Sequence, residues 1–229
     1  TIHHEANHGN ISAQNKSLRW VDKFMGSVAS LPLQLNFQAY APSHLLHHAH
    51  TNIPGRDPDH FMAGPAKAVF PRWLITTVIK TLACIPFVAQ ILFKVLPAQI
   101  SAGIRYFKSD RPGLYRHLQL SLLLLVASFF FGQGLNFLML WWLPTQVAQL
   151  ILQTWFVWLP HAPFTETSRY HNTRIRGWIG SHVMLLGQDH HLIHHMYPRV
   201  PFYRYRRLFR AIRPSLEANK SSIQIPAYS

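Results

Sequence analysis

A long run without a charged residue extends from Leu118 to Pro160. A membrane-spanning helix needs about 20 mainly apolar residues, so this run has room for two spans. Turn-forming and polar residues interrupt it at Gly132, Gln133 and Gly134. The pattern therefore predicts a transmembrane helical hairpin over residues 118–160.

Two other apolar stretches are interrupted by polar residues or proline. Leu74 to Phe93 carries Lys80 near its middle and is followed by Lys94, which predicts a helix in the lipid headgroup region with both ammonium groups reaching outward. Leu18 to Tyr40 is too short to cross a bilayer twice. It is expected to form a bent or interfacial helix with its break at Pro32.

The composition is that of a membrane protein, since 48% of the 229 residues are hydrophobic and only 13% are charged. Lys and Arg number 22 against 8 Asp and Glu. Ten of these basic residues follow Pro160, and the positive-inside rule places that segment in the cytoplasm. The basic residues flank apolar stretches and match no nucleic-acid-binding motif, so a nucleic acid is not expected as a partner.

Histidines form three clusters in polar segments beside the apolar stretches. The first cluster is His4 and His8, the second is His44, His47 and His48, and the third is His191, His194 and His195. A spacing of three or four residues places two imidazoles on one helix face. The third histidine of each HxxHH is rotated by about 100°, so one short helix can supply ligands to two adjacent ions.

Eight clustered imidazoles exceed the four ligands of a tetrahedral site, which favours two metal ions. The single cysteine, Cys84, excludes sites built from several thiolates. Imidazole suits iron, copper, nickel or zinc, so ligand type leaves the metal open. A haem-binding bundle would place its axial histidines inside the spans, and Leu118 to Pro160 contains none. The solitary His60, His117 and His182 are interpreted as ordinary side chains.

Three motifs resemble the histidine boxes of the membrane fatty acid desaturase superfamily. They are HEANHG from His4, HLLHHAHTN followed by GRDPD from His44, and HLIHHMYPRVP from His191. The resemblance covers nearly the whole chain and has the hairpin between the second and third boxes. It implies an all-α integral membrane fold, taken as a single domain over 1–229 with cytoplasmic cap segments 1–70 and 161–229. It also implies that a further transmembrane hairpin precedes the first box.

The resemblance further implies a non-haem centre of two iron ions, O2 as co-substrate, and a separate electron donor such as ferredoxin or cytochrome b5. Sites of this family use one more histidine between the hairpin and the third box. His161 in WLPHAPF and His171 in SRYHNTR are the candidates, and His161, at the mouth of the second span, is preferred. Ligating imidazoles need an acceptor for their second ring nitrogen, and Asp57, Asp59 and Asp189 are the acids chosen for that role.

The reaction and substrate remain open between related chemistries. HTN and DPD near the second box resemble acyl-lipid desaturases, whereas LPH and RYHNTR resemble carotenoid hydroxylases and ketolases. Desaturation of an acyl chain taken from the bilayer is the preferred hypothesis. A membrane protein that binds metal without catalysis is the distant alternative. The basic, aromatic run PFYRYRRLFRAIRP could lie on anionic lipid or dock an acidic electron carrier.

Overall fold

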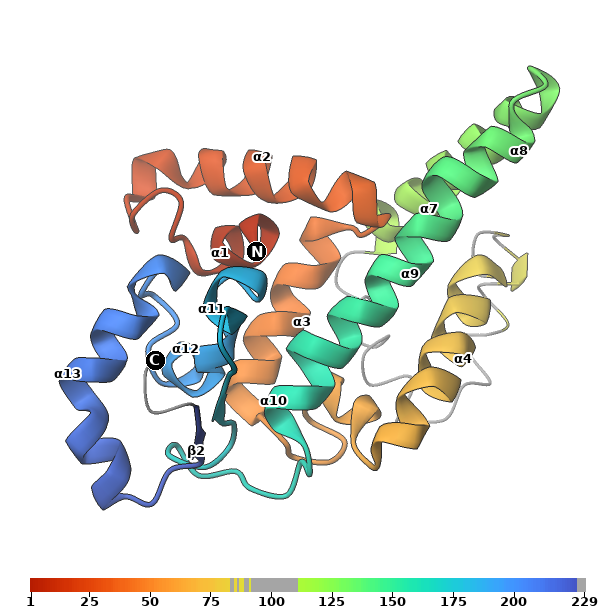
Figure 1. The fold of residues 1–229 in the computed structure, drawn as a ribbon. Coiled ribbons are helices and arrows are strands. Elements are labelled where there is room, and N and C mark those ends of the chain that lie inside the picture. Colours follow the sequence, from red (N-terminus) through yellow and green to blue (C-terminus); the bar gives the residue numbers. More distant parts are fainter. Residues whose placement is uncertain (83–84, 86, 89–90, 92–110, 226–229) are drawn as a thin grey trace.

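The structure is a computed structural model that describes residues 1–82, 85, 87–88, 91 and 111–225 (Figure 1). It is mostly helical, as expected. The helices, in chain order, are α1 (Ile2–His8), α2 (Arg19–Ser30), α3 (Phe37–His50), α4 (Val69–Leu82), α7 (Arg111–Phe130), α8 (Gly134–Phe137), α9 (Leu143–Leu152), α10 (Leu159–His161), α11 (Ser181–Met184), α12 (His191–Met196) and α13 (Tyr205–Ala218). Strands β1 (Ile175–Arg176) and β2 (Ile223–Gln224) pair in parallel.

The predicted hairpin turn lies where the apolar run is interrupted. Helix α7 ends at Phe130 and α8 begins at Gly134, with Gly132 at a φ of 71° in the turn between them. Helices α8, α9 and α10 run on as one helix, with π-helical turns at Leu138–Trp142 and Gln153–Trp158. Within the described residues, Gly134–His161 is the one helix that is long and apolar enough to cross a membrane, judged by length and composition. The number of crossings stays a prediction.

The two shorter apolar stretches form helices that differ in part from the prediction. Helix α4 begins at Val69 rather than Leu74, and most of the stretch beyond Leu82, including Lys94, lies outside the described residues. The break at Pro32 is confirmed, because a 3-10 turn over Leu31–Leu33 separates α2 from α3. Helix α2 then packs closely on α3: a Cβ at Gly26 would lie 2.4 Å from the ring of Phe37.

The apolar core of the C-terminal part anchors the third histidine cluster. Its buried members are Ile175, Leu192, Ile193, Met196, Tyr205, Phe209 and Leu216. On α12, Leu192 and Ile193 are completely buried in this core, so the histidines on either side of them are held in fixed directions. On α13 the apolar side chains point into the same core, and the arginines Arg207, Arg210 and Arg213 are exposed.

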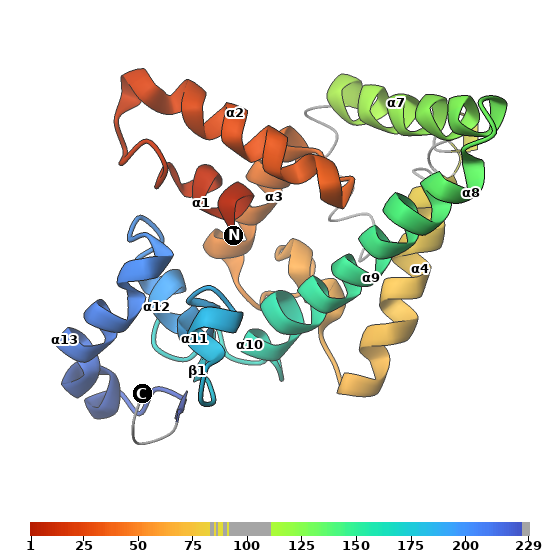
Figure 2. The same cartoon turned by 45° about the horizontal axis from the view of Figure 1, so that its top comes forward.

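The four helices that carry the predicted histidine ligands meet at the centre of the molecule. Helices α1, α3, α10 and α12 come together there in both views, although they lie far apart along the chain (Figures 1 and 2). The tip of the α7–α8 hairpin points away from this centre (Figure 1). The hairpin therefore separates the second and third clusters in sequence without separating them in space.

Candidate metal centre

Nine histidines converge from four helices, and they are the nine that the sequence singled out as ligands. Helix α1 carries His4 and His8 and ends at Gly9, whose φ of 74° turns the chain away from the site. Helix α3 carries His44, His47 and His48. His161 closes α10, and α12 carries His191, His194 and His195.

The imidazoles fall into two groups of four with the ninth between them. The first group is His4, His8, His44 and His194, and the second is His47, His161, His191 and His195. In each group the ligand nitrogens lie within 4.8 Å of one another. His48 lies within the same distance of His194 and His195, one from each group. The second and third clusters thus each supply both groups, as the HxxHH spacing predicted. The first two histidines of each of these two clusters, however, belong to different groups, whereas the prediction placed them on one face.

The distances between neighbouring ring nitrogens are those expected of ligands that share an ion. Nε2–Nε2 separations are 3.0 Å for His4–His194, His8–His44 and His161–His191, 3.1 Å for His44–His48, 3.2 Å for His191–His195 and 3.3 Å for His47–His195. Two nitrogens that bind the same ion at about 2.1 Å lie about 3.0–3.4 Å apart when the nitrogen–metal–nitrogen angle is about 90–110°. The nine side chains therefore fit two ions.

Burial favours the neutral form of most of these imidazoles. Loss of solvation, followed by repulsion from neighbouring imidazoles, lowers the pKa of His4, His44 and His194 well below the usual value. Burial also lowers the pKa of His8 to about 4. A neutral imidazole offers the lone pair that a metal needs, so the site is prepared for a cation without first losing protons.

The structure separates the two candidates between the hairpin and the third box. His161 is buried and belongs to the second group. His171 belongs to neither group, and its Nδ1 lies 2.9 Å from the hydroxyl of Ser168. The preference for His161 thus agrees with its position at the end of α10.

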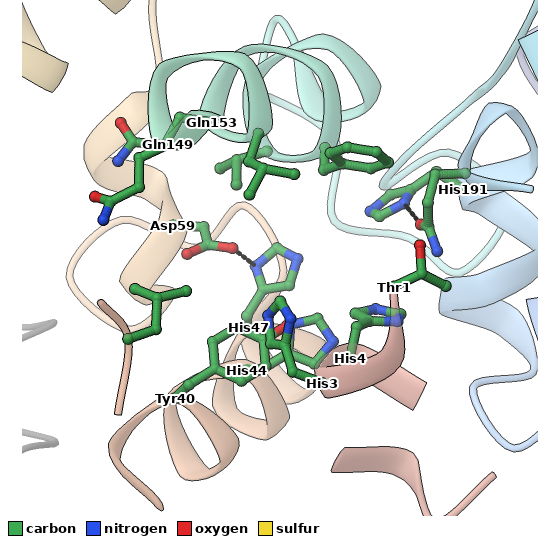
Figure 3. A pocket seen from close by; sticks show the side chains of 15 residues that line it. Thr1, His3, His4, Tyr40, His44, His47, Asp59, Gln149, Gln153 and His191 are labelled. Atoms are coloured by element: carbon green, nitrogen blue, oxygen red, sulfur yellow. Dashed lines mark hydrogen bonds and ion pairs between the residues drawn. The ribbon is translucent and has the colours of Figure 1, made fainter. Parts of the chain in front are cut away.

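A cavity of about 210 Å³ opens beside the histidines (Figure 3). His4, His44, His47 and His191 line it, and Leu35, Leu152, Phe156 and Val157 supply apolar surface. Leu152 and Phe156 come from the long α8–α10 helix, next to or within its second π-helical turn. Such turns are frequent at functional sites, and this one directly precedes His161.

A family model described as fatty acid desaturase matches residues 1–226. The chain belongs to the fatty acid desaturase family. Comparisons with curated proteins and with solved structures found no match. Membership of the desaturase family and the grouped histidines together indicate an oxidoreductase that binds metal.

In this desaturase-family protein, Asp57 contacts Nδ1 of His47, the ring nitrogen that does not face the other histidines. Its Oδ1 lies 2.8 Å from His47 Nδ1 and accepts the Asp59 N–H, while its Oδ2 accepts the Asn52 N–H. Asp59 is more distant, with its Oδ2 3.6 Å from the same nitrogen. Burial lowers the pKa of His47, but Asp59 and Asp57 outweigh that effect and raise it overall. Asp57 therefore takes the predicted position, whereas Asp59 lies near the same nitrogen without a hydrogen bond to it.

Asp189 differs from the prediction. Its carboxylate contacts His182, His190 and the Ser181 hydroxyl, and none of these contacts is with one of the nine histidines. Asp189 lies in the 3-10 turn Gln188–His190, which directs it away from the centre although His191 is only two residues on.

Uncharged groups take the place predicted for Asp189. Gln188 Oε1 lies 2.9 Å from His191 Nδ1, the Tyr205 hydroxyl 2.8 Å from His194 Nδ1, and Thr51 Oγ1 3.2 Å from His195 Nδ1. Because the Thr51 hydroxyl donates to the His47 carbonyl, it accepts from the His195 N–H. These three groups were not predicted from the sequence, because only carboxylates were considered as acceptors. Gln188 could have been predicted, since it lies three residues before His191.

Replacing Tyr205 with phenylalanine is expected to weaken metal binding. The hydroxyl is the partner of His194 Nδ1, and loss of such a partner lowers metal affinity or activity about 10–100-fold. The measurement is the metal retained per chain against a competing chelator. Tyr203→Phe is the matched control, because that side chain is 64% exposed and lies in the same segment. Equal retention by both variants would remove Tyr205 from the site.

Proposed function

We propose that this protein is an O2-dependent, non-haem di-iron membrane oxidoreductase that desaturates the acyl chain of a lipid. The observation that carries the proposal is the pair of four-histidine groups beside a cavity with an apolar wall. Family membership supports the reaction class. Acyl chains and carotenoids both present unactivated C–H bonds to such a cavity, and the acyl chain is the substrate proposed.

Iron is the metal proposed for both groups. Imidazole nitrogens suit iron, and His48 lies between the groups, where it can serve either ion. When bound, the two ions would supply the activation of O2 that removal of hydrogen from an unactivated C–H bond requires. The nine histidines would hold the ions, and Asp57, Gln188, Thr51 and Tyr205 would keep the imidazoles in orientation.

The cavity would position the lipid chain and exclude water. Leu35, Leu152, Phe156 and Val157 offer apolar contacts in the cavity that the histidines also line, so an alkyl segment that fills it would lie beside the metal-binding residues. Holding the reacting bond in one register contributes to rate because the reactants no longer need to meet by chance. No side-chain nucleophile is required of these residues.

A multi-pass position in the membrane, with the histidines on the cytoplasmic side, is part of the proposal. Large apolar side chains are exposed along the hairpin, among them Phe130 at 88% and Leu140 at 78%. On α2, Trp20, Phe24 and Val28 are exposed, as is Leu31 directly after it, and this helix would lie at the interface. Such surface is unfavourable in water and supports contact with lipid. Electrons would come from a separate carrier such as ferredoxin or cytochrome b5.

Enlarging a side chain in the cavity should impair turnover without releasing iron. Leu152→Trp fills space in the cavity that the histidines line, and displacement of a substrate by about 1 Å can cost about 100-fold in rate. Ile151→Trp is the control, because Ile151 is the neighbouring residue and is 50% exposed. Product formed per iron is the quantity to compare. If Leu152→Trp turns over like Ile151→Trp, the cavity is not the substrate site.

Mass spectrometry of lipids tests the proposed reaction. Acyl lipids and carotenoids are analysed from cells that express the full-length gene and from cells that express a His194→Ala, His195→Ala variant. An acyl product that lacks two hydrogens and is absent with the variant supports desaturation. Oxygen added to an acyl chain or carotenoid would assign the protein to hydroxylation or ketolation. Iron binding without oxygen consumption, given reductant and lipid, would favour a non-enzymatic metal-binding protein.

A further inference from the structure

A second cluster of metal-binding side chains lies outside the nine-histidine centre. It consists of His182 on α11 and of Asp189 and His190 in the turn Gln188–His190. Their ligand atoms lie within 4.8 Å of one another, and none of the three belongs to either four-histidine group. From the sequence, His182 was interpreted as an ordinary side chain.

The two imidazoles approach one carboxylate oxygen. His182 Nδ1 lies 3.0 Å and His190 Nδ1 2.9 Å from Asp189 Oδ1. The other oxygen, Oδ2, accepts the Ser181 hydroxyl at 3.1 Å. Asp189 and His190 are buried, at 4% and 1% exposure, whereas the His182 side chain is 21% exposed.

The direction of the His190 ring distinguishes this cluster from a simple hydrogen-bonded one. His190 Nδ1 is buried and makes no hydrogen bond, although it lies 2.9 Å from Asp189 Oδ1. A ring nitrogen that donates points along its N–H at the acceptor. Ligands of a common ion instead approach one another at about 3 Å while their lone pairs point at the ion. The close but poorly aligned contact between His190 and Asp189 is compatible with two ligands of one ion.

We propose that His182, His190 and Asp189 bind one divalent cation of the Zn2+ type, separate from the di-iron centre. Two imidazoles and a carboxylate match the nitrogen and oxygen ligands of Zn2+, and three protein ligands leave a fourth position for water. The partly exposed His182 gives the ion access from solvent. The buried Asp189 carboxylate supplies a negative charge, and the ion would bind the buried His190 Nδ1 beside it.

The ion would brace the turn that supports the third histidine box. Asp189 and His190 lie between Gln188, whose side chain holds His191, and His191 itself. An ion tying this turn to His182 would connect α11 to the start of α12. The bound cation would therefore make the Gln188–His191 pair more rigid without belonging to the di-iron centre.

Metal analysis of the full-length, iron-loaded protein tests the proposal with Zn2+ as probe. Wild type is expected to retain one Zn2+ per chain in addition to its iron after removal of free metal. His182→Gln and Asp189→Asn are expected to lose this Zn2+ and to keep their iron. His171→Gln is the matched control, since His171 lies in the same half of the chain outside both clusters, and it should bind Zn2+ like wild type.

Equal Zn2+ retention by wild type and His182→Gln, with iron unchanged, would overturn the proposal, and so would a wild type without bound Zn2+. If a variant also loses its iron, its zinc content no longer reports on this site alone, and the test then uses the wild type. Zinc-edge X-ray absorption of the wild type should show imidazole and oxygen ligands. A spectrum without imidazole would contradict the site. Iron content and lipid products report on the di-iron proposal separately, so the two proposals can fail independently.

Discussion

Replacement of His194 with alanine is expected to lower product formation by at least about 100-fold and to reduce the iron bound per chain. Loss of a group that only orients a ligand already costs about 10–100-fold, and His194 is a proposed ligand itself. Its side chain is fully buried, its Nε2 lies 3.0 Å from that of His4, and it belongs to the first group while also lying near His48. Iron per chain and lipid product are measured on the same preparation.

His171→Ala is the control for that experiment. This histidine contacts Ser168 and belongs to neither group, so iron and product should stay at the wild-type level. Full activity in the His194 variant, or equal losses in both variants, would contradict the assignment of His194 as a ligand.

Asp57→Asn is expected to lower iron affinity about 10–100-fold. The carboxylate faces His47 Nδ1 and accepts two backbone N–H groups, those of Asn52 and Asp59. An amide at this position accepts with one atom only and turns its NH2 toward a donor, which leaves a buried group unpaired at a cost of about 1–3 kcal/mol. His47 would lose its orientation and part of its basicity. Iron retention against a chelator is the measurement.

Asp22→Asn is the matched control for Asp57. Asp22 is also a buried carboxylate that accepts a backbone N–H, from Ser12, but it lies on α2 and contacts none of the nine histidines. This variant should lose stability to thermal unfolding and keep its iron affinity. If both variants lose stability and neither loses affinity, Asp57 supports the fold only.

Spacing marked the three histidine clusters in the sequence, whereas His161 was predicted from the resemblance to the desaturase family. Spacings of three and four residues determine which imidazoles share a helix face, and the hairpin turn at Gly132 follows from the interruption of an apolar run. The bend at Pro32 is equally local, since proline cannot continue the hydrogen bonding of α2.

The supporting partners could not be predicted in the same way. Tyr205 reaches His194 across the core between α12 and α13, and Thr51 reaches His195 from the end of α3. Such contacts depend on the packing of separate elements, which no spacing encodes. Asp189 was predicted wrongly as a partner of a ligand histidine. It is close to His191 in sequence, but a 3-10 turn directs its carboxylate to His182.

The central claim is that the nine histidines hold two iron ions, and Mössbauer spectroscopy of the full-length protein loaded with 57Fe, combined with metal analysis, tests it most directly. The account predicts two iron ions per chain in nitrogen and oxygen surroundings, both lost when His194 and His195 are replaced. One iron per chain, or iron unaffected by those replacements, would contradict it.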